Sequence, residues 1–207
     1  MTPKTQRSVL LLALLVAGFS AILFYAAGAW LGGIALAQAQ QSLDQRAQSL
    51  ALAAARSLDV DAHAQVASIN EPAYVKAGLA LQMLSASQSG LSGSSLSSYR
   101  RNGGFWQCVV GEPGQQFKNA RLDEVAEASV RSRHVESRLS DDGQWFEAAA
   151  PLTDKSGALV GLVQAHVPSG RLQDLHADLN SARLWLTLLG CLAGGLIATF
   201  ARMRTLR

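Results

Sequence analysis

Residues 144–167 read QWFEAAAPLTDKSGALVGLVQAHV, and this stretch carries the clearest secondary-structure signal in the chain. Two largely apolar segments, 144–152 and 158–167, flank the polar segment 153–157, which ends in glycine. Apolar runs of this length on either side of a polar turn with glycine are typical of paired strands. The stretch therefore predicts an antiparallel β-hairpin.

The segments that precede the hairpin predict both helices and a further strand. Pro72 fits the first turn of a helix, which we expect to run to about Met83. The serine-rich segment 85–98 predicts a loop, 105–110 a short strand and 122–130 a helix. Helices mixed with a small antiparallel sheet place this part of the chain in the α+β class.

Two long segments outside this region contain no charged residue, namely 8–37 and 184–201. A helix needs about 20 apolar residues to cross a bilayer, so both segments are long enough. A helix on the surface of a soluble domain would show a polar face, which neither segment has. We therefore predict two transmembrane helices that bracket the α+β domain.

The distribution of charge predicts how these helices are oriented. All 15 acidic residues lie between Asp44 and Asp178, whereas both outer flanks are basic. Short flanks rich in Lys and Arg stay in the cytoplasm. We therefore expect both termini in the cytoplasm of a bacterium and the middle of the chain in the periplasm. The two helices would then lie in the lipid of the inner membrane. The net charge of +3 comes from the flanks, and no basic patch with interleaved aromatics predicts nucleic-acid binding.

A second interpretation of the N-terminus is a signal peptide. Lys4 and Arg7 precede an apolar run that ends in Ala35-Leu36-Ala37, which resembles a cleavage site after Ala37. The apolar core of a signal peptide has about 7–15 residues, and this run is about twice as long. The length favours an uncleaved transmembrane anchor.

Short stalk helices are expected between the membrane and the domain. Leu43, Ala47, Leu50 and Ala54 follow a 4-3-4 spacing, as in a short coiled-coil seam. Simple packing within the chain would give the same spacing. The predicted organisation is 1–7 cytoplasmic N-terminus, 8–37 transmembrane helix, 38–58 stalk, 59–168 extracytoplasmic domain, 169–183 stalk, 184–201 transmembrane helix and 202–207 cytoplasmic tail.

Each predicted transmembrane helix contains a GxxxG motif, formed by Gly28 with Gly32 and by Gly190 with Gly194. Small residues four apart allow helix backbones to approach closely in lipid. The two motifs predict helix packing, either in a homodimer or in a hetero-oligomer.

The sequence contains no pattern typical of an enzyme, a cofactor site or a metal centre. It has no GxSxG, phosphate-binding or dinucleotide-binding motif, so we expect no catalytic residue, no enzymatic activity and no cofactor. Cys108 and Cys191 fall in different predicted segments and cannot pair within one chain. His63 follows Asp59 and Asp61 closely, but a helix-capping Asp beside a solvated His explains the cluster better than a cation does.

The hairpin resembles the closing hairpin of extracytoplasmic single Cache domains, which are PAS-like sensors. The resemblance rests on Trp145 to Leu152, Asp154, Gly157 and Leu159 to Val163. Leu58 to Val66 followed by Glu71-Pro72-Ala73-Tyr74 is similar to a segment in the input regions of bacterial cyclases and sensor kinases. The resemblance implies a long N-terminal helix, a sheet that holds a small-ligand pocket, and a return helix to a second membrane span.

A pocket for a small periplasmic ligand would combine aromatic side chains with a few polar groups. Arginine could bind a carboxylate with two hydrogen bonds, although a solvated charge run beside core aromatics would look the same. The candidate ligand-binding residues are Trp106, Trp145, Arg100, Arg101, Arg131, Arg133 and His166.

These observations predict an inner-membrane sensory module that signals in trans to a separate output protein. The chain ends at Arg207, so it is either a complete sensor or the input part of a longer protein. The alternative is a structural or accessory subunit of a larger inner-membrane complex that uses the domain as a binding surface.

Overall fold

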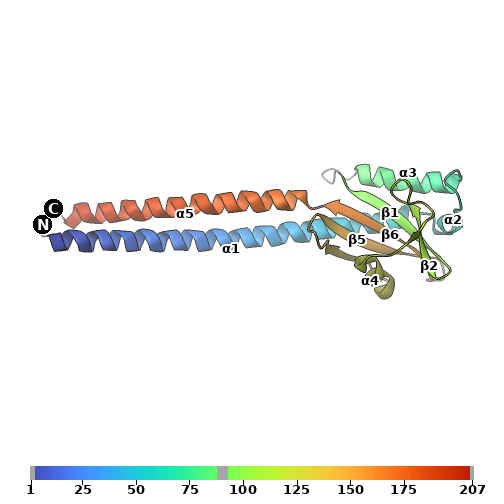
Figure 1. Ribbon diagram of the computed structural model, residues 1–207, viewed down its shortest axis with the longest axis horizontal. Coiled ribbons are helices and arrows are strands. Elements are labelled where there is room, and N and C mark those ends of the chain that lie inside the picture. Colours follow the sequence, from blue (N-terminus) through green and yellow to red (C-terminus); the bar gives the residue numbers. More distant parts are fainter. Residues whose placement is uncertain (1–2, 88–92, 206–207) are drawn as a thin grey trace. The chain divides into compact units, whose positions relative to one another are not determined.

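The computed structural model describes residues 3–87 and 93–205 (Figure 1). It divides into two compact units: residues 40–170, called the domain below, and residues 1–39 with 171–207, called the helical pair. The helices are α1 Pro3–Ser57, α2 Val60–Gln65, α3 Pro72–Ser87, α4 Glu124–Ser132 and α5 Gly170–Thr205. The strands are β1 Ser95–Asn102, β2 Phe105–Val110, β3 Asn119–Ala120, β4 Glu136–Leu139, β5 Trp145–Thr153 and β6 Leu159–Pro168.

All six strands of the domain form one antiparallel sheet in the order β3-β2-β1-β6-β5-β4. The predicted hairpin is β5 and β6, and its turn is held by Asp154. The Asp154 carboxylate accepts hydrogen bonds from the backbone N–H groups of Ser156 and Ala158 at 2.8 and 2.9 Å. Gly157 follows with a φ of 81°, a backbone conformation that favours glycine. The α+β class predicted from the sequence is confirmed.

One prediction about the middle of the chain was wrong. The expected loop at 85–98 includes the first residues of β1, a strand with neighbours on both sides; residues 88–92 lie outside the described residues. Its sequence, SLSSYRRN, is polar and has little strand propensity. Pairing with β2 and β6 supplies its backbone hydrogen bonds, so the tertiary structure decides the strand. The sequence also missed β3, β4 and α2.

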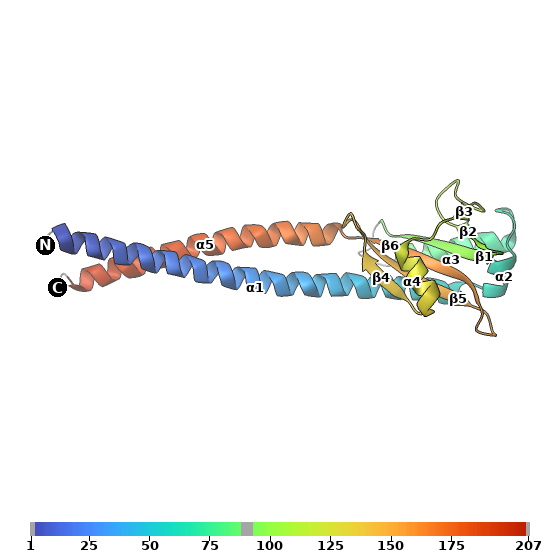
Figure 2. The ribbon, with the colours of Figure 1, turned by 60° about the horizontal axis from the view of Figure 1, so that its bottom comes forward.

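The two faces of the sheet carry different helices. Leu50 and Ala54 of α1, from the seam predicted in the stalk, are fully buried. α1 contacts the sheet at β4, where the Ser137 hydroxyl donates to the Asp44 carboxylate at 2.5 Å. α2 and α3 lie on the same side of the sheet as α1, and α4 covers part of the other side (Figure 2). This arrangement buries the α1 seam within the chain.

The segment 58–66 contains a short helix and a buried histidine. Asp59 caps α2, since its carboxylate accepts a hydrogen bond from the Ala62 backbone N–H at 3.2 Å. His63 was expected to be solvated, and this is wrong, because it is only 2% exposed. The ring lies against β1, where the Ser98 hydroxyl is 3.0 Å away, and the local sequence could not reveal a contact between residues so far apart in the chain.

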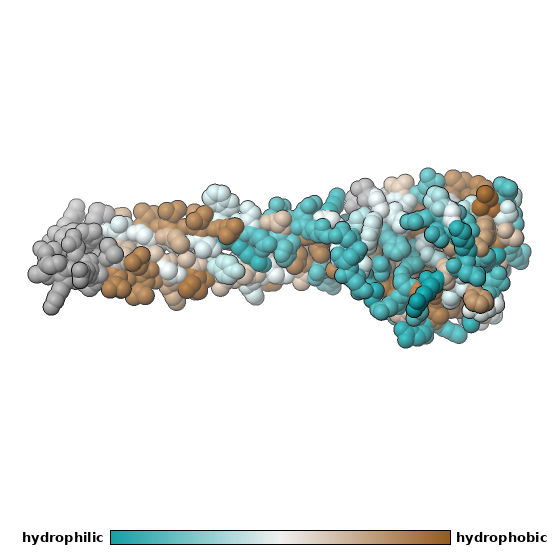
Figure 3. Space-filling model, in the orientation of Figure 1, coloured by the Kyte–Doolittle hydropathy of each residue, from teal (hydrophilic) through white to brown (hydrophobic). Residues whose placement is uncertain are grey.

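In the helical pair, α1 and α5 run antiparallel and contain stretches long and apolar enough to cross a membrane. Hydrophobic residues are visible on the surface of the helical pair (Figure 3). Large apolar side chains such as Phe19, Trp30 and Leu192 are exposed. The glycines of the two motifs face the opposite helix of the same chain. A Cβ on Gly194 would lie 2.4 Å from Ala17 Cα, and one on Gly28 would lie 3.1 Å from Leu186 Cδ1. The glycines thus allow close packing within one chain, and self-association stays a prediction.

Candidate functional site

The candidate site lies on the face of the sheet that carries α4. Side chains alternate between the two faces along a strand. Ala149 of β5 and Leu162 of β6 pack in a cluster with Leu122, Val125 and Ala126, at or near α4. This assigns Tyr99, Gln164 and His166 to the α4 face by their register, and Ser98 and Arg100 to the opposite face.

A cleft of about 550 Å³ opens on this face. It lies between the strands β1 and β6 and the segment 111–121, which connects β2 to α4 through β3. Its lining is Ser95, Leu96, Ser97, Tyr99, Cys108, Gly111, Glu112, Gln115, Asn119, Ala120, Arg121 and His166. The volume is that of a small-molecule site.

The lining combines neutral hydrogen-bonding groups with charges of both signs. Burial raises the pKa of the Tyr99 phenol, and the Ser97 hydroxyl lies 3.3 Å from the phenol oxygen. Burial also raises the pKa of the Cys108 thiol, so both groups are neutral near pH 7. Glu112 and Arg121 contribute one charge of each sign. This set of groups can orient a small polar molecule.

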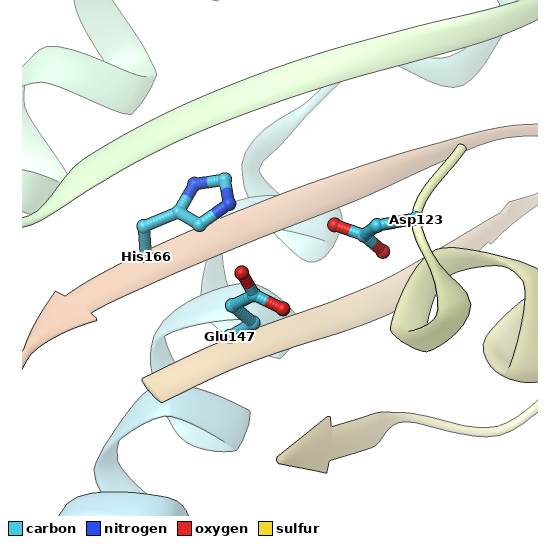
Figure 4. Close-up of side chains that lie close together, drawn as sticks. All are labelled: Asp123, Glu147 and His166. Carbon is cyan, nitrogen blue, oxygen red and sulfur yellow. The ribbon is translucent and has the colours of Figure 1, made fainter. Parts of the chain in front are cut away.

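Three groups of the metal-ligating kind converge at the side of the cleft where His166 lies (Figure 4). One ligand atom from each of Asp123, Glu147 and His166 lies within 4.8 Å of the others. Burial raises the pKa of Glu147, and the negative charge of Asp123 raises it further. His166 and Arg138 oppose this shift.

A second hollow, of about 400 Å³, lies between the β2 end of the sheet and α4. Its lining includes Trp106, Arg121, Leu122, Glu127 and Arg131. Its lining therefore combines apolar and charged side chains.

The structure separates the seven candidate ligand-binding residues. Trp106 and Arg131 line the second hollow together, and His166 lines the cleft. Arg100 lies on the opposite face of the sheet, where its guanidinium donates to the Ala64 carbonyl at 3.2 Å and to the Gln107 side chain at 2.9 Å. The remaining three are exposed and line neither space: Arg101, Arg133 and Trp145.

Sequence reasoning missed Asp123 and Glu147, which stand far apart in the sequence. The only available signal was the alternation of Gln164 and His166 along β6, which places both side chains on one face.

No protein-family model matches the chain, and no curated protein matches it. Among solved structures, the chain is similar to the ligand-binding domain of the Pseudomonas aeruginosa PAO1 amino acid chemoreceptor PctC in complex with GABA. That match has 14% identity and a TM-score of 0.47, and it covers 72% of this chain and 68% of the other. The ligand-binding domain of the Campylobacter jejuni chemoreceptor Tlp3, in complex with L-valine, matches with 16% identity and a TM-score of 0.44, covering 76% of this chain and 66% of the other.

A third similar structure is a putative GAF sensor protein from Burkholderia vietnamiensis. It has 16% identity and a TM-score of 0.33, and the match covers 77% of this chain and 98% of the other. All three TM-scores are below 0.5.

Proposed function

We propose that this protein is an inner-membrane sensory module whose extracytoplasmic domain binds a small polar ligand and signals in trans to a separate output protein. The observation that carries the proposal is the cleft of about 550 Å³ on the α4 face, with its mixture of apolar, hydroxyl and charged groups. The Cache-like sequence of the β5–β6 hairpin supports the same function.

The membrane setting is supported by the composition and the exposure of the helical pair. Large apolar side chains such as Leu15, Ile22 and Leu188 are more than half exposed. Lipid would cover these side chains, whereas exposing so many to water is unfavourable. Reporter fusions near Met1 and after Arg207 should report cytoplasm, and a fusion at Gly93 should report periplasm. A mature protein that starts at Gln38 would show instead that the N-terminus is a cleaved signal peptide.

The ligand can be sought by its effect on stability, with the full chain in detergent. A molecule that binds only the folded state stabilises it by about 2.7 kcal/mol at 100 times its Kd. A library of small carboxylates, amines and polar neutral molecules should include at least one that raises the Tm with increasing concentration. Tyr99→Phe and Arg121→Gln should weaken that effect, because both residues line the cleft.

Arg133→Gln is the matched control, since Arg133 is exposed and lines neither the cleft nor the second hollow. A ligand whose effect is unchanged by Tyr99→Phe and Arg121→Gln would place binding elsewhere. A library that produces no shift would contradict a small-ligand sensor.

A chain of contacts connects the α4 face of the sheet to α1 through β4. Arg138 Nε lies 3.7 Å from Glu147 Oε2 on the cleft face. The next residue, Ser137, projects to the other face, where it donates to Asp44 and accepts a 2.7 Å hydrogen bond from Gln48. A change at Glu147 can therefore bias α1, which continues into the helical pair. Signalling also requires that a partner bind the two states with different affinity.

Signalling in trans predicts a partner that purifies with this chain in stoichiometric amount under mild detergent. Deleting residues 52–167 should alter the activity of that partner while leaving the complex intact. A deletion that dissolves the complex without altering any activity would favour a structural subunit.

One observation favours this second function. Val75, Leu79 and Met83 are spaced four residues apart on α3, and all three are exposed, Met83 by 70%. An exposed apolar stripe on a helix is typical of a surface that binds another protein. If this surface holds the complex together, Leu79→Glu should release the partner, whereas Lys76→Glu, which leaves the stripe intact, should retain it.

A further inference from the structure

Glu147 of β5, His166 of β6 and Asp123, the residue before α4, lie close together (Figure 4). Glu147 and His166 are direct partners in the antiparallel register of β5 and β6. Cross-strand partners have Cβ atoms about 5 Å apart and project to the same face of the sheet. Asp123, the residue that precedes α4, lies beside them.

The Asp123 carboxylate is held in place before any ligand arrives. Its Oδ1 accepts a 2.8 Å hydrogen bond from the Ala126 backbone N–H, which caps α4. Its Oδ2 accepts a hydrogen bond from the side-chain amide of Gln164. Gln164 is only 4% exposed, so its orientation is fixed by the surrounding core. Each carboxylate oxygen has a second lone pair that these bonds leave free.

The negative charge at this point is only partly compensated. Glu147 Oε2 is buried and accepts no hydrogen bond within the described part of the chain. Arg138 Nε lies 3.7 Å from this oxygen, while Arg138 Nη1 pairs with Glu124 at 2.5 Å. Two carboxylates beside one imidazole therefore form a site that a cation would stabilise.

The chemistry of the three groups selects the kind of cation. Imidazole nitrogen together with carboxylate oxygen suits first-row transition metals such as Zn²⁺, whereas Mg²⁺ and Ca²⁺ prefer oxygen alone. Zn²⁺ binds these ligands at about 2.0–2.2 Å, which places ligand atoms of a tetrahedral site roughly 3.4 Å apart. The observed limit of 4.8 Å needs only small side-chain rotations to reach this value.

We propose that Asp123, Glu147 and His166 form a binding site for a divalent transition metal such as Zn²⁺, with its open coordination position toward the cleft. His166 belongs both to the metal-ligating group and to the cleft lining, which gives the direction of the open position. Three protein ligands leave room for water or for a ligand donor atom in a tetrahedral site. Metal binding at these residues is independent of whether the domain acts as a sensor.

The test is titration of the full chain in detergent with Zn²⁺ at pH 7, followed by calorimetry, with Mg²⁺ as the comparison ion. The wild-type chain should bind one equivalent of Zn²⁺ with at least tenfold preference over Mg²⁺. His166→Gln and Glu147→Gln should each weaken Zn²⁺ binding at least tenfold. Asp123→Asn should also weaken it while retaining the helix cap, since Asn caps as well as Asp.

His134→Gln is the matched control, because His134 is exposed and lies outside the metal-ligating group. Its Zn²⁺ affinity should equal that of the wild type. Circular dichroism of each metal-free variant establishes whether it is folded. If His166→Gln folds poorly, Glu147→Gln still tests the site, because glutamine is nearly isosteric with glutamate. Equal Zn²⁺ affinity in wild type, Glu147→Gln and His166→Gln would overturn the proposal, as would no binding by the folded wild-type chain.

Discussion

The imidazole of His63 lies 3.0 Å from the hydroxyl of Ser98, and both side chains are almost completely buried between α2 and β1. This contact connects the short helix α2 to the interior strand β1 of the sheet. Burial lowers the pKa of His63 to about 4, and the positive charge of Arg100 acts in the same direction. The folded domain therefore keeps this ring neutral at pH values where a free histidine would be protonated.

This lowered pKa predicts an acid-sensitive domain. The pKa of this histidine in the unfolded chain is about 6.5. Above that pH the ring is neutral in both the folded and the unfolded state, so His63 does not reduce stability there. As the pH falls from 6.5 toward 4, only the unfolded state takes up the proton, and the folded state loses about 3 kcal/mol of stability. Urea unfolding followed by tryptophan fluorescence at pH 7, 5.5 and 4 measures this loss.

His63→Gln should remove most of that loss, because glutamine does not titrate. The acidic residues contribute equally to the pH dependence of the wild type and of the variant. The difference between the two pH profiles of stability therefore isolates His63. Parallel profiles would show that His63 does not carry the pH dependence.

Ser137→Ala should lower the free energy of unfolding of the domain by about 1–3 kcal/mol, because it removes a hydrogen bond to the Asp44 carboxylate. Combining it with Asp44→Ala should cost less than the sum of the two single changes, since both remove the same contact. Ser49→Ala is the control, since its hydroxyl bonds only within α1 and is exposed. Strict additivity of Ser137→Ala and Asp44→Ala would argue against this coupling between α1 and β4.

Gly161→Ala should destabilise the domain by about 1–3 kcal/mol, as overpacking of a filled core does. A Cβ at this position would lie 2.5 Å from the Tyr99 carbonyl oxygen and 3.1 Å from Leu152. Gly78→Ala is the matched control. It lies in α3 with no atom within 4 Å of the new Cβ, so it should be neutral or stabilise by up to about 1 kcal/mol. Chemical denaturation compares the two, and equal stabilities would contradict the close approach at Gly161.

Gly194→Ile should separate the two helices of the helical pair, because its Cβ would lie 2.4 Å from Ala17 Cα. The adjacent Gly195 has no atom within 4 Å, so Gly195→Ile should be tolerated. Thermal unfolding in detergent, followed by near-ultraviolet circular dichroism, to which Trp30 and Trp185 contribute, should show a lower Tm for Gly194→Ile alone. If both variants unfold like the wild type, this packing face is not used.

The hairpin and the two apolar helices could be predicted because their signals are local. β5 and β6 are apolar runs joined by a turn, and 8–37 and 184–201 lack charge altogether. The helix at Pro72 was also predictable, although α3 continues to Ser87. Period, turn chemistry and charge are properties of neighbouring residues and need no tertiary contact to be read.

The remaining features depend on which strands pair and in what register. β1 is polar in sequence and becomes a strand because β2 and β6 complete its hydrogen bonds. The register of β1 places Arg100 on the α2 side of the sheet and Tyr99 in the cleft. The register of β5 with β6 places Glu147 beside His166. A one-residue slip would reverse every one of these directions. The sequence by itself determined the kinds of element and the apolar helices, whereas only the sheet pairing decided which side chains share a site, because residues distant in the chain become neighbours only when strands pair.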